Sequence, residues 1–334
     1  MLGPARRQRA ITAVALLLAL LGVLVALLDW REVQRVAAEA SWQWSPLTLV
    51  FTAASYIFLS YSYALINRSF GIRLGRRELL AIGFVSSAMI ASVGGLAGHS
   101  LRVLLMVRRG QAAGDIMAPS LFHSYLESLA FFALIPAGLV YLLLTQPLSH
   151  NVAVGVGAGT ALLGGAFALT AVVFFWGPVR RVALRLVRTV CRLAARRDIG
   201  PSLEDFDATL RRGLGEVRNR PGLLALPLWL ILADRLARVA VVWLCFEALG
   251  SDVGPAVAMT GFAIGVALGV MSLAPGGLGV QEGSMVGVFH LLGVPLEEAV
   301  LAALLFRVAY YSVPFGLSLA FYRGLLRRGR TAPA

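Results

Sequence analysis

The sequence predicts an all-α, polytopic membrane protein. Its 334 residues are 58% hydrophobic and the mean hydropathy is +0.79, which is too apolar for a soluble domain of this length. Several apolar stretches are close to the length that crosses a bilayer as a helix. The formal net charge of +13 comes from 30 basic residues, all of them arginine. Because these arginines flank the apolar stretches, they indicate topology and contact with anionic lipids, not a nucleic-acid partner.

Six apolar stretches are predicted to cross the membrane completely. They are residues 10–28, 46–66, 119–144, 152–176, 222–249 and 299–322. Residues 29–44 are predicted as a mixed-charge loop with interfacial tryptophans. Arginines gather before the first span, after the second and after the last. By the positive-inside rule, this distribution places both termini and residues 67–78 in the cytoplasm.

Two further segments are apolar but broken by glycine, and we predict that both are re-entrant. Residues 79–107 contain Gly94 and Gly95, and residues 256–292 contain the run from Ala274 to Gly283. A full crossing by the first segment is the alternative, but it would place three arginines outside. If the first segment enters from the cytoplasm and the second from outside, every arginine cluster stays cytoplasmic.

The two broken segments resemble each other. Ser92 to Leu96 and Ala274 to Leu278 share Gly-Gly-Leu, and each segment is followed by a span that carries a charge and a proline. Opposed broken helices in corresponding halves are typical of inverted-repeat transporters with a site near the bilayer midplane. The single membrane domain (1–334) then divides into halves 1–178 and 222–334.

The halves are joined by an arginine-rich segment, residues 179–221. Val182, Leu186 and Val190 recur there at helical spacing opposite the arginines. This pattern predicts an amphipathic helix on the inner leaflet, and a solvated cytoplasmic loop is the alternative.

Charged residues inside apolar segments are the candidate site, because a charge at the bilayer centre costs roughly 2.5–3.5 kcal/mol. Glu282 and Arg307 flank the second broken segment and are expected to pair, either to bind a headgroup or as a structural ion pair. Asp234 and Arg238 lie four apart on one helix, which predicts an intramembrane ion pair. The other candidates for headgroup binding or gating are Pro275, Gly276, Gly277, Gln281, Tyr310, Glu127, Arg102, His99, Gly94 and Gly95.

No catalytic constellation is present in the sequence. It has no H-E-x-x-H, nucleophile elbow or P-loop, and Cys191 and Cys245 lack metal-ligand spacing. We therefore expect no metal, no cofactor and no enzymatic activity.

Two motifs resemble a known family. A-P-G-G-L-G-V-Q-E-G (274–283) and L-F-R-V-A-Y-Y-S-V-P-F-G-L (305–317) are similar to the signature of the lysylphosphatidylglycerol synthase transmembrane-region, or flippase-like domain, family, and G-G-L-A-G-H-S-L-R (94–102) extends the match. Bifunctional members of that family carry a soluble aminoacyl-tRNA-dependent transferase after this domain. Because the chain stops at Ala334, the resemblance implies the translocation half alone, with Glu282 and Arg307 as its functional residues.

The expected function is that of a lipid flippase or transporter in a bacterial inner membrane. Its substrate would be a phospholipid, an aminoacylated phospholipid or a related glyco- or isoprenoid lipid. The alternatives are a membrane enzyme that acts on a lipid-linked phosphate and an accessory subunit for a lipid synthase. Expected partners are lipids with anionic headgroups, a lipid-synthesising enzyme and a second copy of the chain.

Overall fold

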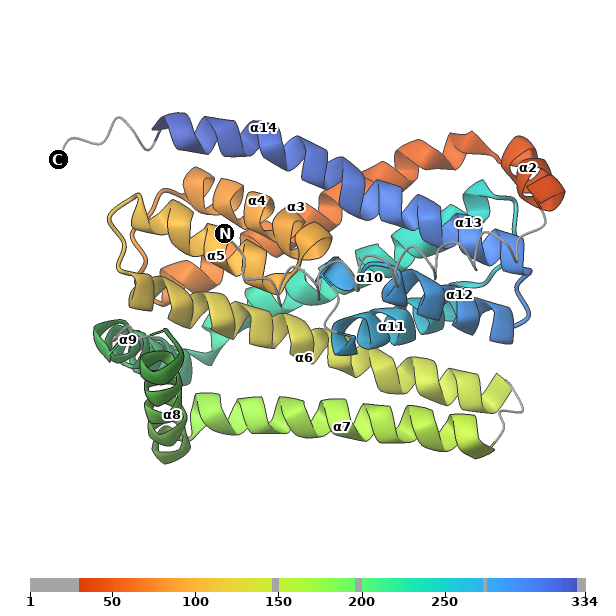
Figure 1. Cartoon of the computed structure of the whole chain (residues 1–334). Helices are drawn as coiled ribbons and strands as arrows, with labels where there is room; N and C mark the ends of the chain where they lie inside the picture. Colours follow the sequence, from red (N-terminus) through yellow and green to blue (C-terminus); the bar gives the residue numbers. More distant parts are fainter. Residues whose placement is uncertain (1–29, 146–149, 196–199, 273–274, 329–334) are drawn as a thin grey trace.

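The computed structural model describes residues 30–145, 150–195, 200–272 and 275–328 (Figure 1). Every regular element in these ranges is a helix. Two described helices, Ser45–Ser69 and Leu296–Leu326, are long and apolar enough to cross a membrane. A third is added if the bent pair Gly164–Phe175 and Gly177–Leu193 is one span. The protein is therefore a helical membrane protein, and the number of six spans stays a prediction.

Five of the predicted spans correspond to long helical stretches. Along the bundle run α3 (Ser45–Ser69), α6 (Ala113–Thr145), α7 (His150–Phe175), α10 (Ala225–Ala248), and α13 (Leu296–Arg307) with the π-helical turn η4 (Val308–Ser312) and α14 (Val313–Arg328) (Figure 1). The predicted span at residues 10–28 lies outside the described residues.

The prediction of a loop at residues 29–44 is wrong from Trp30 onward. This stretch forms α2 (Trp30–Glu39) and the 3-10 turn η1 (Trp42–Trp44). Val36 is buried, α2 packs on α13, and Ser41 N–H donates to the carbonyl of Ala248 at 2.7 Å. The charged residues of α2 lie on an amphipathic helix. The loop was predicted from the number of charges alone, and that number does not show their 3.6-residue period.

The first broken segment is a helical hairpin of α4 (Arg76–Val93) and α5 (Gly95–Val107). The chain reverses at Gly94, whose φ of 122° is a conformation that favours glycine. Arg109, just beyond α5, donates to Glu78 in the first turn of α4 at 3.3 Å and to the carbonyl of Leu325 in α14 at 3.1 Å. Both ends of this hairpin therefore lie at the same end of the bundle as the end of α14.

The second broken segment is also a hairpin, formed by α11 (Pro255–Met271), the short turn η3 (Pro275–Gly277) and α12 (Val280–Leu291). The two helices of this hairpin are antiparallel, and side chains of α12 pack against glycines of α11. A Cβ on Gly261 would lie 2.0 Å from the ring of Phe289, and one on Gly265 would lie 2.2 Å from Met285. Only glycine allows this close helix contact, so the small residues of α11 set how tightly the hairpin closes.

The second hairpin is seated in an aromatic core. The ring of Phe246 on α10 lies edge-on to Phe289 at 4.9 Å, and Phe262 on α11 meets Phe306 on α13 at 5.9 Å. All four side chains are buried. Such pairs fix ring orientation as well as burying area, so they position α11 and α12 against the spans.

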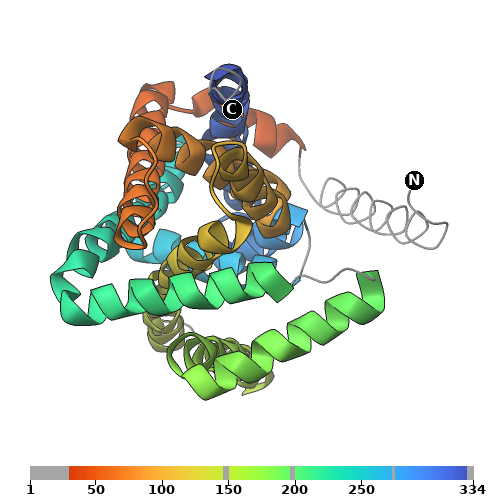
Figure 2. The same cartoon turned by 90° about the vertical axis from the view of Figure 1, so that its left-hand side faces the viewer.

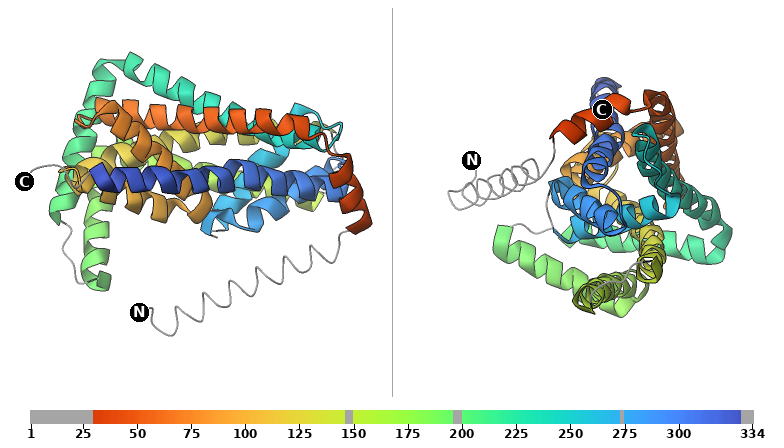
Figure 3. Two further views of the ribbon diagram at one scale, coloured as in Figure 1. Left: turned by 90° about the horizontal axis from the view of Figure 1, so that it is seen from above. Right: turned by 90° about the vertical axis from the view of Figure 1, so that its right-hand side faces the viewer.

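Two helices lie across one end of the bundle. They are α8 (Gly177–Ala195) and α9 (Gly200–Asn219), and the 3-10 turn η2 (Pro221–Leu224) leads from α9 into α10. The axis turns by 101° between the end of α7 and α8. Figure 2 looks at this end of the molecule, and Figure 3 shows from above how both helices cross it.

Candidate functional site

The tips of the two hairpins meet at residues that are only partly buried. Gly276, with φ 62°, lies so close to α4 that a Cβ there would be 2.6 Å from the carbonyl oxygen of Ser92. The hydroxyl of Ser92 in turn donates to the carbonyl of Tyr311 at 3.3 Å. The two broken segments, far apart in sequence, thus touch through backbone at this point, which we call the tip contact.

Glu282 and Arg307, expected from the sequence to pair, form an ion pair beside the tip contact. Nη1 of Arg307 donates to Oε1 of Glu282 at 2.6 Å, and both terminal nitrogens of the guanidinium lie 3.3 Å from the carbonyl oxygen of Gly276. The other carboxylate oxygen of Glu282 accepts the N–H of Gly279 at 2.7 Å, which caps the start of α12. Arg307 therefore ties the tip of the second hairpin to α13.

Gln281 is linked to the same arginine through Tyr311. Its amide donates to the hydroxyl of Tyr311 at 2.8 Å, and both side chains are buried. The guanidinium of Arg307 stacks over the ring of Tyr311 at 4.4 Å. Gly277, with φ 67°, packs on Gln281. These contacts make Tyr311 part of the site, a residue that the sequence analysis did not include.

The π-helical turn η4 explains how the tyrosines reach the site. Pro314 has no N–H, so it cannot donate to the carbonyl of Tyr310 four residues earlier, and the hydroxyl of Tyr56 donates to that carbonyl at 3.1 Å. π-turns occur frequently at functional sites. The sequence signal for Tyr311 was its place between Arg307 and this proline.

A buried polar network runs from Tyr310 into the bundle. Its hydroxyl lies 2.8 Å from that of Ser55, which donates to Asp234. Asp234 is fully buried and pairs with Arg238 at 2.9 Å, as predicted, and with Arg235 at 3.2 Å. The expected pair on α10 is therefore one part of a larger structure.

The network continues to α6. Arg235 contacts Oε2 of Glu127 at 3.3 Å, and Nδ1 of His123 lies 2.7 Å from the same carboxylate. His123 is also 2.7 Å from the hydroxyl of Ser62 on α3. His99 stands nearby on α5, 3.4 Å from Ser124 of α6. Glu127 thus links α6 to α10.

Arg102 differs from the other buried arginines. Its side chain is 0% exposed, and it donates to the hydroxyls of Ser86 at 2.7 Å and Ser87 at 3.3 Å. The guanidinium lies over the ring of Tyr63 at 4.4 Å, and its Nη1 has no hydrogen-bond partner. None of the described carboxylates forms an ion pair with it.

The described charges around this network do not balance. The arginines here are Arg102 and Arg235, which are buried, and Arg238, which is partly buried, whereas the carboxylates are Glu127 and Asp234. Buried charges normally have partners, because desolvating a lone one costs several kcal/mol. One positive charge in the described network is left without a carboxylate.

The remaining predicted candidates, Gly94, Gly95 and Pro275, lie at the turns of the two hairpins. Gly94 forms the turn of the first hairpin, but Gly95 opens α5 in an exposed position where a Cβ would meet only His99, at 4.0 Å. Pro275 begins η3. No cluster of three or more metal-ligand side chains occurs among the described residues.

These features define a class: a helical membrane protein with two helical hairpins whose tips meet beside a partly buried ion pair. The chain belongs to the family described as lysylphosphatidylglycerol synthase TM region, whose profile matches residues 10–318. It is also 28% identical over 103 residues to a UPF0104 membrane protein of Methanothermobacter thermautotrophicus. That match covers 30% of this chain and 28% of the archaeal protein.

Proposed function

We propose that this protein is a lipid flippase that moves an anionic phospholipid, or a related aminoacylated, glyco- or isoprenoid lipid, between the leaflets of a bacterial cytoplasmic membrane. The observation that carries the proposal is the tip contact, which lies beside the partly buried pair of Glu282 and Arg307. A broken backbone at membrane depth is tolerated where it faces protein or a polar cavity, which is the arrangement of transporter substrate sites.

The charge imbalance at Arg102 supports an anionic headgroup. A phosphodiester would supply the negative charge that the described network lacks, and a guanidinium can grip two of its oxygens at once. Arg307 is less suited to this role, because both of its terminal nitrogens already donate to Glu282 or to the carbonyl of Gly276. In this mechanism the headgroup approaches Arg102 while the acyl chains stay in the bilayer.

Opposed re-entry of the hairpins is the second part of the proposal. The ends of the first hairpin lie with the arginine-rich connections, which the positive-inside rule places in the cytoplasm with both termini. The second hairpin would enter from outside, so that separation of the two tips opens a path from either side. Rocking of one half against the other would then alternate access.

Cysteine labelling tests this topology. In a variant whose two native cysteines are replaced, Glu297→Cys is expected to react with an impermeant reagent added outside intact cells. Arg73→Cys and Arg108→Cys, at the two ends of the first hairpin, are expected to react only after permeabilisation. Outside labelling of Arg108→Cys with inside labelling of Arg73→Cys would mean that the first hairpin crosses completely.

Reconstitution tests transport. The protein is placed in liposomes with a trace of headgroup-labelled phosphatidylglycerol, and loss of the outer-leaflet signal to an impermeant quencher is followed. Transport should exceed that of empty vesicles and should fall about tenfold or more in Arg102→Met. Signal loss equal to that of empty vesicles across anionic, zwitterionic and aminoacylated lipids would overturn the proposal. A new lipid product would instead indicate a membrane enzyme.

A further inference from the structure

The helix α8 has an exposed apolar stripe at the end of the bundle. Val182, Leu186, Val190 and Leu193 are 60%, 64%, 53% and 80% exposed. Their spacing of four, four and three residues places them on one face. Because α8 follows α7 after a turn of 101°, it lies across the end of a long apolar helix. This is the geometry of a helix lying in a membrane interface.

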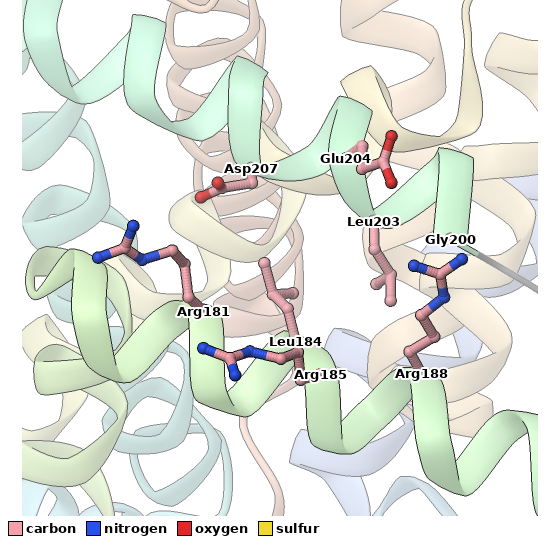
Figure 4. A pocket seen from close by; sticks show the side chains of 8 residues that line it. All are labelled: Arg181, Leu184, Arg185, Arg188, Gly200, Leu203, Glu204 and Asp207. Atoms are coloured by element: carbon pink, nitrogen blue, oxygen red, sulfur yellow. The ribbon is translucent and has the colours of Figure 1, made fainter.

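A second stripe on α8 is basic and borders a pocket. Arg181, Arg185 and Arg188 are spaced four and three residues apart, and they line a cavity of about 200 Å³ between α8 and α9 (Figure 4). Arg181 and Arg185 extend to the same side in this view, and neither forms an ion pair with a described carboxylate. Arg188 packs on Gly200, where a Cβ would lie 2.5 Å from its Nη2.

The acidic wall of the pocket, on α9, does not neutralise Arg181 and Arg185, because Asp207 is paired with other arginines. Asp207 accepts from Arg180 at 2.6 Å and also pairs with Arg211. Burial alone would raise the pKa of Asp207, but the hydrogen bonds from these two arginines outweigh it and lower the pKa. Glu204, the other carboxylate, is exposed. The pocket therefore keeps an excess of positive charge.

We propose that this pocket binds the phosphodiester of an anionic phospholipid in the leaflet on which α8 lies. The apolar stripe would lie among the acyl chains while Arg181 and Arg185 hold the phosphate. The cavity is smaller than the roughly 300–1,000 Å³ of sites that enclose a drug-sized ligand, so it suits a headgroup whose chains remain outside. This surface site is separate from the tip contact and does not depend on the proposed transport.

The test compares two variants that remove the same charge. Arg181→Gln/Arg185→Gln alters the pocket, whereas Arg73→Gln/Arg218→Gln removes two exposed arginines elsewhere. Each protein, in an uncharged detergent, is titrated with phosphatidylglycerol or phosphatidylcholine, and bound lipids are counted by native mass spectrometry. A third arm adds sodium phosphate as competitor.

We expect the parent protein to prefer phosphatidylglycerol. The pocket variant should bind its tightest phosphatidylglycerol about tenfold more weakly, and the control variant should change less than about twofold. Equal weakening in both variants, or no weakening in either, would overturn the proposal. Competition by millimolar phosphate would overturn it as well, because it would identify a site for free anions. If the double variant does not fold, the two single variants carry the same test.

Discussion

The two hairpins hold their arginines in different ways. Arg307 approaches the second hairpin from α13 and meets the carboxylate of Glu282 and the carbonyl of Gly276. Arg102 belongs to the first hairpin itself and meets two serine hydroxyls and the ring of Tyr63. The charge of Arg307 is therefore balanced by the carboxylate of Glu282, whereas no described carboxylate balances the charge of Arg102.

Their turns differ as well. The first hairpin reverses at the single residue Gly94, whereas the second uses positive φ at Gly276, Gly277 and Gly279. The two hairpins therefore differ in role under the proposed function. The ion pair of Arg307 with Glu282 fixes the second hairpin to α13, and Arg102 of the first hairpin offers its charge to a ligand.

The largest expected loss of stability follows substitution of Arg307. Arg307→Met removes one partner of a nearly buried pair and leaves Glu282 uncompensated, a change that costs up to about 3–5 kcal/mol. The thermal midpoint in uncharged detergent should fall steeply, and Glu282→Gln on the same background should restore part of the loss. An unchanged midpoint would show that the pair does not fasten the hairpin.

The next effect concerns the tip contact. Gly276→Ala would place a Cβ 2.6 Å from the oxygen of Ser92 at positive φ, and such strain costs about 1–3 kcal/mol. Gly283→Ala on α12 is the matched control, because nothing lies within 4 Å of its Cβ. Thermal melting should separate the two variants, and equal midpoints would argue against close apposition of the tips.

A smaller effect is expected where the first hairpin begins and ends. Arg109→Met loses Glu78 and the carbonyl of Leu325, and a partly exposed pair of this kind contributes about 1 kcal/mol. Amide exchange in the last turns of α14 should become faster. Arg108→Met, an exposed neighbour, serves as the control and should leave this exchange unchanged.

The smallest effect on stability should come from Arg102→Met. Replacing an uncompensated buried charge with an apolar side chain of similar length is often neutral or stabilising, so the midpoint should stay within about 1 kcal/mol of the parent. Transport should nevertheless fall. Destabilisation as large as that of Arg307→Met would erase the contrast between the hairpins.

The helical class and the broken segments could be predicted because each follows from local composition. Gly94 and the run from Ala274 to Gly283 break apolar periodicity, and the structure turns at both. The partners of the buried charges were harder to predict from the sequence. Asp234 with Arg238 was expected from helical spacing, and Arg307 with Glu282 from their places beside the second broken segment. Ser55 and His123, in contrast, join the network through contacts between distant helices.

The family match likewise agrees with the resemblance carried by the two C-terminal motifs. The C-terminal motif places Tyr311 between Arg307 and Pro314 but does not give its role. Its role depends on a π-turn, which arises from the proline downstream and from tertiary hydrogen bonds to Tyr56 and Ser92. Similarly, α2 was missed because its helix is stabilised by packing on α13.

That π-turn has a mechanical consequence for the last span. A π-turn holds one residue more than an α-turn, so α14 is rotated by about 100° relative to a continuous helix from α13. The extra residue is stored at Val308–Ser312, beside the tip contact. If this turn relaxed to α-helix, α14 would swivel about its own axis and Tyr311 would leave Gln281. Rotation of α14 and the contact of Tyr311 with the second hairpin are therefore coupled.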